Sequence, residues 1–277
     1  RRQRQMCIRD RNMNKIKVMT IFGTRPEAIK MAPLVKELEK REEIESIVCV
    51  TAQHRQMLDQ VLDTFNITPD YDLNIMKQGQ TLVDITTRVL QSLSEVISQV
   101  KPNIVLVHGD TTTTLSGSLA AFYNQVSVGH VEAGLRTYDK YSPFPEEVNR
   151  QVTGVIADMH FAPTQVSKNN LLKEGKKEET IYVTGNTAID ALKTTVKDEY
   201  YHPIFDKIGN DKMILLTAHR RENLGEPMKN MFRAIKRIVE EFDDIQVVYP
   251  VHLNPLVRQA ADEVLGDNSK VHLIEPL

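Results

Sequence analysis

Short apolar runs alternate with longer amphipathic ones along this 277-residue chain, and this alternation constrains its fold most. Residues 16–22, IKVMTIF, are nearly continuous in apolar and β-branched side chains, as in a strand buried on both faces. The stretches 26–40 and 81–98 have the three-to-four spacing of amphipathic helices. Further strand candidates are 45–50, 103–108, 126–131, 180–185, 213–218, 245–250 and 270–275. Strands that alternate with helices predict an α/β fold with parallel sheets wound from βαβ units.

The chain is long enough for two α/β domains. A polar and aromatic connection precedes a fresh strand at Met213, so we predict Rossmann-like domains over 13–185 and 186–277 with a cleft between them. Few strand candidates follow residue 212, whereas open sheets of this kind usually have about five or six strands. We therefore expect the second domain to be incomplete.

The first twelve residues, RRQRQMCIRDRN, do not share the pattern that follows. They are rich in arginine, and no apolar segment of a signal peptide comes after them. We interpret residues 1–12 as a non-native or disordered extension, with a basic arm for nucleic acid as the alternative.

Charge and composition exclude several classes of function. The formal net charge is −2, from 35 basic and 37 acidic side chains, so neither nucleic acid nor an anionic membrane is an expected partner. No apolar run approaches the roughly 18 residues that span a bilayer. Cys7 and Cys49 offer neither metal-ligand spacing nor a disulfide framework, which favours a cytoplasmic protein.

The segment FGTRPEAIK (22–30) begins a helix directly after the first strand. Thr24 and Glu27 have the spacing of a capping box. The helix N-terminus, with Arg25 and Lys30 nearby, favours a phosphate or pyrophosphate. An ordinary capped helix with solvated basic residues explains the same pattern equally well. The segment lacks both a dinucleotide fingerprint and a P-loop.

Two consecutive strands end in acidic residues. Asp110 follows the strand at 103–108, and Glu132 follows the strand at 126–131. Asp110 has the commoner alternative role of a helix N-cap. Two strands that bring carboxylates to one edge of a sheet nevertheless indicate acid–base chemistry, because different surroundings push the two pKa values apart.

Four further segments carry polar residues. Glu146 and Arg150 lie four apart in PEEVNRQ (145–151), so a helix-surface ion pair is the simple interpretation. In TAHRREN (217–223) and YPVHLNP (249–255), His219, Arg220 and His252 follow strands, where arginine binds phosphate and histidine titrates near neutral pH. TAQHRQML (51–58) is most simply a polar loop that opens a surface helix.

Taken together, these segments closely resemble the bacterial non-hydrolysing UDP-N-acetylglucosamine 2-epimerases. The resemblance runs in family order from Met13 to the end of the chain and includes FGTRPEAIKMAPL, VLVHGDTTTT, GHVEAGLRT, PEEVNRQ and AHRREN. It implies two Rossmann-like domains in a glycosyltransferase-B-like arrangement. It also implies reversible C2 epimerisation of UDP-N-acetylglucosamine to UDP-N-acetylmannosamine for bacterial surface polysaccharides. The family eliminates and re-adds UDP and uses no redox cofactor or metal.

The resemblance also assigns roles to individual residues. Asp110, Glu132 and Glu146 match the catalytic carboxylates, and which of them removes the C2 proton stays open. His219 matches a histidine that could assist UDP departure. Arg25, Lys30, Arg220 and His252 match substrate-binding positions, with the last two in the nucleotide and regulatory region. Gln53 and Gln56 match part of a site for a second UDP-N-acetylglucosamine that activates the enzyme. A homodimer is expected on the same ground.

One departure from the family concerns the end of the chain. Members continue with a GGxQEEAPSLGxPV-like stretch that holds uridine and phosphate, so we expect this chain to bind UDP-sugars poorly and to epimerise little. Three alternatives remain: a glycosyltransferase of the same fold, a hydrolysing epimerase, and a nucleotide-sugar-binding protein without activity. Product analysis distinguishes them, because the non-hydrolysing enzyme alone returns UDP-linked sugar.

Overall fold

A computed structural model describes most of the chain as two compact units. The described residues are 15–52, 55–77, 79–196, 199–220 and 223–276. The first unit ends at Val196 and the second follows it.

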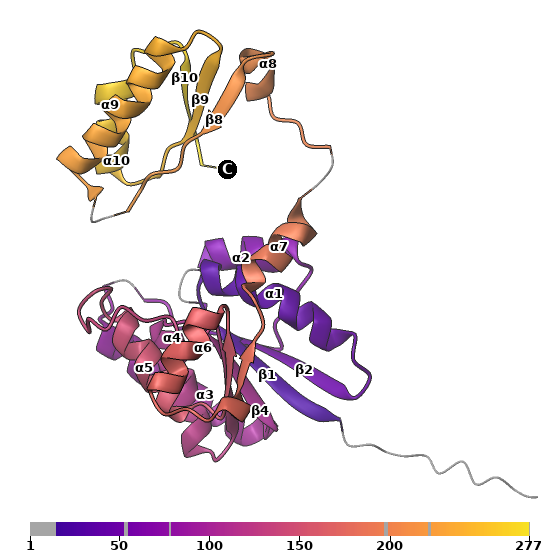
Figure 1. The fold of residues 1–277 in the computed structure, drawn as a ribbon. Helices are drawn as coiled ribbons and strands as arrows, with labels where there is room; N and C mark the ends of the chain where they lie inside the picture. The colour runs from indigo at the N-terminus through magenta and orange to yellow at the C-terminus, as the bar shows by residue number, and fades with distance from the viewer. Residues whose placement is uncertain (1–14, 53–54, 78, 197–198, 221–222, 277) are drawn as a thin grey trace, which may run out of the picture. The chain divides into compact units, whose positions relative to one another are not determined.

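The first unit is built on a parallel seven-stranded sheet of order β3-β2-β1-β4-β5-β6-β7 (Figure 1). Its strands are β1 (Ile16–Phe22), β2 (Ile44–Val50), β3 (Tyr71–Asp72), β4 (Ile104–His108), β5 (Ser127–Val131), β6 (Met159–Ala162) and β7 (Ile181–Val183). In β1, Val18 and Phe22 enter one hydrophobic core, whereas Met19 and Ile21 enter the other. This confirms the prediction of a central strand buried on both faces.

Helices cover both faces of this sheet. The core on the Val18 side is closed by α1 (Arg25–Glu39), α2 (Arg55–Thr64) and α7 (Thr187–Thr195). The core on the Met19 side is closed by α3 (Leu82–Val100), α4 (Thr112–Tyr123) and α5 (Glu146–Ile156). A smaller cluster lies under α6 (Gln165–Lys173), and a short 3₁₀ helix, η1 (Glu178–Thr180), precedes β7. The first unit is therefore a three-layer α/β sandwich, as the alternating pattern predicts.

The order of the strands determines where a ligand site is expected. From β1 the chain moves outward to β2 and β3, and it then returns to place β4 on the other side of β1. Such a reversal opens a crevice beyond the carboxyl ends of the two central strands, where open α/β sheets bind ligands. The segments after β1, β4 and β5 are neighbours at this edge, because these strands are adjacent in the sheet. They contain Arg25, Asp110 and Glu132.

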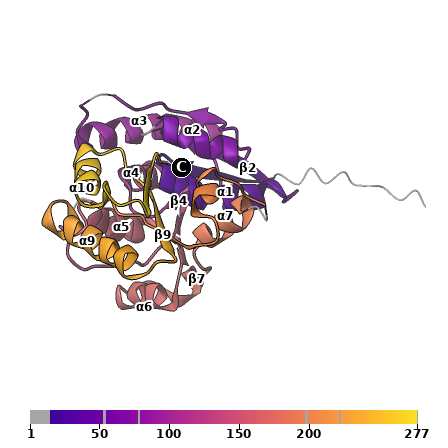
Figure 2. The ribbon, with the colours of Figure 1, turned by 90° about the horizontal axis from the view of Figure 1, so that it is seen from above.

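The second unit is a smaller α/β layer structure with a parallel sheet of order β10-β9-β8. Its elements are α8 (Ile204–Ile208), β8 (Lys212–Leu215), α9 (Glu226–Glu241), β9 (Ile245–Pro250), α10 (Pro255–Leu265) and β10 (Val271–Ile274). α9 and α10 pack on one face of this sheet around Phe232 and Tyr249 (Figure 2). α8 packs on the other face against Val248. Within the residues that the model describes, no helix could cross a bilayer.

The two compact units divide later in the chain than the predicted domains. The sequence places the boundary after residue 185, whereas the first unit extends to Val196. The difference is α7, which packs against α1 and buries Ala191 in the first core. The cleft between the two domains stays a prediction.

Candidate active site

The start of α1 is organised around the carboxylate of Glu27, which is 2% exposed. One oxygen accepts hydrogen bonds from the backbone N–H groups of Gly23 (3.0 Å) and Thr24 (2.8 Å), and the other accepts from the hydroxyls of Thr111 (2.6 Å) and Thr114 (3.2 Å). The predicted capping box of Thr24 and Glu27 is present. Glu27 thus connects the loop after β1 to the loop after β4, and its carboxylate binds the two backbone N–H groups that directly precede α1.

Gly23 is required at this point by close packing. A Cβ atom there would lie 1.9 Å from Oγ1 of Thr51 and 2.8 Å from Oγ1 of Thr113. Both hydroxyls are buried and lie 3.0 Å apart, so a side chain at residue 23 would force buried groups to shift. The strand end therefore tolerates no side chain larger than hydrogen.

Asp110 lies two residues after the end of β4, behind Gly109, and its side chain is 30% exposed. The N-cap of α4 is Thr111, whose hydroxyl accepts a hydrogen bond from the backbone N–H of Thr114 (3.1 Å). This excludes the alternative in which Asp110 is only a helix cap. The Asp110 backbone carbonyl accepts a hydrogen bond from Asn149 Nδ2 at 2.9 Å, and its carboxylate pairs with the guanidinium of Arg150.

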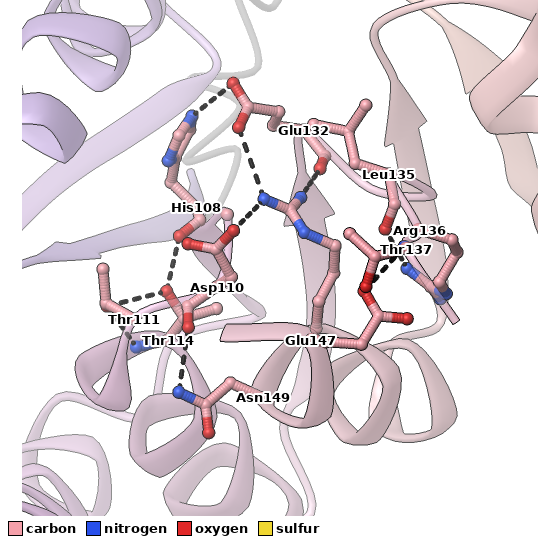
Figure 3. Close-up of polar contacts among 12 residues, drawn as sticks. His108, Asp110, Thr111, Thr114, Glu132, Leu135, Arg136, Thr137, Glu147 and Asn149 are labelled. Carbon is pink, nitrogen blue, oxygen red and sulfur yellow. Dashed lines mark hydrogen bonds and ion pairs between the residues drawn. The ribbon is translucent and has the colours of Figure 1, made fainter. Parts of the chain in front are cut away.

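Glu132 follows β5 with a left-handed backbone, φ = 61°. Non-glycine residues seldom adopt this conformation, and at functional sites the surrounding structure holds them in it. Its side chain is 10% exposed and forms an ion pair with Lys30 Nζ. His108 Nε2 lies 3.5 Å from the same carboxylate oxygen (Figure 3). Burial raises the pKa of Glu132, but the contacts with His108 and then Lys30 outweigh it and lower the pKa to about 2.

Arg150, on the second turn of α5, joins the two carboxylates. Its side chain is 5% exposed, its Nη2 pairs with Asp110, and the same nitrogen lies 3.5 Å from Glu132 Oε1. Its Nη1 donates to the backbone carbonyl of Glu132. The helix-surface pair of Glu146 and Arg150, the simple interpretation of the sequence, is therefore wrong. Arg150 points toward the edge of the sheet rather than toward solvent.

Glu146 begins α5 beside two pockets of the first unit, both of which Asp110 also lines. One pocket contains Pro143 and Arg150, and the other contains Thr24. Oε2 of Glu146 is buried and has no hydrogen-bond partner within the described part of the chain. Of the three predicted carboxylates, Glu146 is thus the one that no described cation contacts.

The adjacent Glu147 has a structural role that was not predicted from the sequence. The Glu147 carboxylate accepts hydrogen bonds from the backbone N–H groups of Thr137 (3.0 Å) and Tyr138 (3.1 Å) and from Gln151 Nε2 (2.8 Å). Burial raises the pKa of Glu147, but these bonds outweigh it and hold that pKa below its usual range. Glu147 thereby fixes the loop that follows Glu132.

Arg136 also has a structural role. Its guanidinium forms a two-point ion pair with Glu174, with nitrogen–oxygen distances of 2.6 and 2.8 Å. This pair joins the loop after β5 to the end of α6 and does not involve the three candidate carboxylates.

His130 is fully buried behind the site, with Nε2 2.7 Å from the carbonyl oxygen of Gly109. Burial and then the nearby Arg150 lower its pKa to about 3, so the ring is neutral near pH 7. A carbonyl oxygen can only accept, so Nε2 carries the proton and donates it. His130 therefore supports the Gly109 turn rather than exchanging protons.

The depressed pKa of His130 predicts a loss of stability in acid. Between about pH 6.5 and pH 3 this histidine is protonated in the unfolded chain and neutral in the folded chain. The contribution of His130 to the free energy of unfolding is therefore complete above pH 6.5 and falls as the pH decreases. The slope is at most about 1.4 kcal/mol per pH unit. We expect urea unfolding to show a shallower decrease over this range in His130→Asn than in the wild type. Parallel slopes, or an NMR titration of His130 near its usual pKa, would contradict the prediction.

In the second unit, two of the predicted residues lie together. The rings of His219 and His252 stack with centroids 5.1 Å apart. β8 ends at Leu215, earlier than predicted, but the segment continues beside β9 because Tyr249 donates its hydroxyl proton to the carbonyl oxygen of Ala218 (2.5 Å). Nδ1 of His252 accepts from the backbone N–H of Asn254 (3.0 Å), which leaves Nε2 for a ligand.

The other predicted binding residues are less fully placed. Arg25 is exposed at the first position of α1, and Lys30 lies on the same helix, where its Nζ forms an ion pair with Glu132. Arg220 is exposed in the segment after β8. Gln53 lies outside the described residues. Gln56 lies in α2, but its side chain is not described.

Comparison with known proteins gives a consistent result. The family model described as UDP-N-acetylglucosamine 2-epimerase matches residues 36–277. The UDP-N-acetylglucosamine 2-epimerase of Bacillus subtilis is 72% identical over 96% of this chain and 70% of its own length. The chain spans 70% of the putative UDP-N-acetylglucosamine 2-epimerase of Thermotoga maritima, to which it is 58% identical.

Solved structures show the same likeness. A putative UDP-N-acetylglucosamine 2-epimerase from Listeria monocytogenes superposes with a TM-score of 0.87 at 62% identity, over 95% of this chain and 69% of that one. The Neisseria meningitidis enzyme bound to UDP-GlcNAc superposes with a TM-score of 0.85 at 53% identity, over 94% of this chain and 72% of that one.

Proposed function

Because the chain belongs to the UDP-N-acetylglucosamine 2-epimerase family, we propose that its cluster of Asp110, Glu132 and Glu146 converts UDP-N-acetylglucosamine reversibly into UDP-N-acetylmannosamine. The family membership makes it an isomerase of the bacterial non-hydrolysing type, with a role in surface polysaccharide precursors. The observation that carries the proposal is the meeting of three carboxylates at the switch point of the first sheet. Support for the substrate comes from the N. meningitidis relative, whose structure holds UDP-GlcNAc.

The proposed reaction requires one carboxylate that stays anionic and another group that gives and takes a proton. A C2–H bond of a neutral sugar is not acidic, but it becomes so as C1 acquires positive charge while UDP departs. The site therefore needs an anion that stabilises this charge and a second group that moves the C2 proton. Glu132, with a pKa of about 2, suits the first role, and Glu146, without a cation partner in the described chain, suits the second.

The remaining predicted residues take roles on the nucleotide side of the reaction. Within the same proposal, Arg25 and Lys30 contribute positive charge toward the diphosphate, and His219 assists the departure of UDP. Arg220 and His252 bind the nucleotide or a regulator, and Gln53 and Gln56 belong to a site for an activating second UDP-N-acetylglucosamine. The stacked rings of His219 and His252 support a shared role for these two residues.

A homodimer forms part of this proposal as well. Val148, Val152 and Val155 recur at helical spacing on α5 and are 38%, 37% and 75% exposed. Phe122 and Tyr123 at the end of α4 are 59% and 64% exposed, and α4 packs against α5. An exposed apolar surface of this kind is typical of a protein–protein interface, and we propose a second copy of the chain as its partner.

Proton exchange at C2 tests the proposed function. The protein is incubated with UDP-N-acetylglucosamine in deuterated water, and the sugar is followed by NMR, with high enzyme concentration and long incubation so that slow turnover is visible. We expect UDP-N-acetylmannosamine that carries deuterium at C2. Release of free N-acetylmannosamine would instead indicate a hydrolysing epimerase. The absence of both the epimerised product and deuterium exchange at C2 would contradict the proposal.

A further inference from the structure

We propose that Arg150 is a positioning residue for epimerisation: it holds Asp110 and Glu132 in fixed orientations and leaves Glu146, which has no cation partner in the described chain, available for proton transfer. This inference rests on the proposed function of the same cluster. It concerns a residue for which the sequence pattern indicates only a surface ion pair and to which the resemblance assigns no role.

The contacts of Arg150 reach two separate loops. Asp110 lies in the loop after β4, and Glu132 lies in the loop after β5. Arg150 pairs with the first carboxylate and lies 3.5 Å from the second, and it also donates to the backbone carbonyl of Glu132. A planar guanidinium can bind acceptors at several fixed angles, whereas the ammonium of lysine is a single point charge. The geometry therefore requires arginine and not merely a positive charge.

The bond to the Glu132 carbonyl also fixes the backbone. Glu132 has φ = 61°, in the left-handed region that a side chain disfavours. Near it, Gly134 has φ = 86°, and a Cβ at that position would lie 2.3 Å from the carbonyl oxygen of Ser167. The bond from Arg150 therefore adds to this packing and helps to hold the backbone from which the Glu132 carboxylate extends.

Arg150 is itself held in place by α5. Asn149 donates to the backbone carbonyl of Asp110 at 2.9 Å, and Glu147 binds the backbone of Thr137 and Tyr138. With 5% of its side chain exposed, Arg150 presents little surface to a substrate. We therefore expect it to act through the two carboxylates rather than by binding the sugar nucleotide.

Glu146 lies on the same helix but is not part of this network. Its Oε2 is buried without a partner within the described chain, beside the two pockets that Asp110 also lines. Arg150 consequently divides the three carboxylates into two that are held and one that is free. Such a division suits a reaction in which one anion must remain in place while another group gives and takes a proton.

Two substitutions of Arg150 test the proposal. In Arg150→Lys, one positive charge remains but the planar guanidinium with its several donors is lost. We expect kcat to fall about 100-fold with little change in KM, because misplaced reacting groups slow the chemical step. In Arg150→Ala, added guanidinium chloride at low, non-denaturing concentration is expected to restore part of kcat. The wild type is assayed in parallel for C2 deuteration, so a failure of the proposed function is recognised separately.

Arg136→Lys is the matched control. The Arg136 side chain is also buried and lines the pocket that Asp110 and Glu146 line, but it forms its two-point ion pair with Glu174 and not with a candidate carboxylate. We expect a similar decrease in melting temperature for both lysine variants and a large loss of kcat for Arg150→Lys alone. An increase in KM at unchanged kcat in Arg150→Lys would overturn the proposal in favour of substrate binding. Equal losses of kcat in the two lysine variants would overturn it in favour of a general effect on folding.

Discussion

Glu132→Gln is expected to lower kcat about 1000-fold, because it removes a fixed negative charge from the site. Burial raises the pKa of this carboxyl, but contacts with His108 and Lys30 outweigh burial and bring it to about 2. Such a carboxyl is anionic at any working pH and is a weak base. It is therefore suited to stabilising positive charge at C1 while UDP departs, and glutamine keeps its shape without its charge.

The measurement separates the two bonds that break. Exchange of ¹⁸O between bridging and non-bridging positions of the diphosphate reports cleavage of the C1–O bond, and uptake of deuterium reports removal of the C2 proton. If Glu132 acts on the charge at C1, both exchanges fall together in Glu132→Gln. Retention of oxygen exchange with loss of deuterium uptake would instead identify Glu132 as the proton-transfer group.

Glu174→Gln provides the control for this substitution. Glu174 also pairs with a buried arginine, Arg136, but it lies at the end of α6 and contacts none of the three carboxylates. We expect it to affect unfolding by urea and to leave both exchange rates near those of the wild type.

Much of the fold follows from local patterns in the sequence. The continuous apolar runs identify β1, β2, β4 and β9 within a residue or two, because a strand covered on both faces has apolar side chains throughout. Two strands of the first sheet were missed. β3 has two residues, and β6 is the short run MHFA, whose His160 gives no sign of burial although it is 1% exposed. Their positions depend on neighbouring strands rather than on their own side chains.

The candidate site was predicted in part. Asp110 and Glu132 were correctly expected at one edge, because adjacent parallel strands end together. The prediction of a surface ion pair for Arg150 was wrong, although its spacing from Glu146 is that of an ordinary pair on a helix surface. A signal was nevertheless present: the buried positions of α5 include Glu147, Arg150, Thr153 and Gly154, which recur at helical spacing. They are polar or small, so a search for apolar periodicity does not detect this face.

No local sequence pattern predicts the contacts of the site between residues that lie far apart in the chain. Glu27 binds Thr111 and Thr114, and Lys30 binds Glu132, across separations of 84 to 102 residues. Such pairs follow from the order of the strands, and a single sequence does not fix that order.

Glu146→Gln is expected to slow deuterium uptake far more than oxygen exchange, whereas Glu132→Gln slows both. Glu146 borders both pockets near Asp110, and no cation in the described chain holds its carboxylate. If Glu146 carries the C2 proton, glutamine cannot exchange it, so we expect deuterium uptake at C2 to fall about 1000-fold. Cleavage of the C1–O bond does not need this proton transfer, so oxygen exchange in the diphosphate should decrease much less.

The neighbouring glutamate makes the test specific. Glu147→Gln is the same change one residue away, at a carboxylate that fixes the backbone of Thr137 and Tyr138. We expect it to reduce stability and to slow both exchanges in equal proportion, because it loosens the loop without altering the proton-transfer group. A ratio of deuterium to oxygen exchange that changes in Glu147→Gln but not in Glu146→Gln would refute the assignment of Glu146. A ratio that changes in Glu146→Gln alone would identify Glu146 as the group that moves the C2 proton, with Glu132 as the fixed anion of the site.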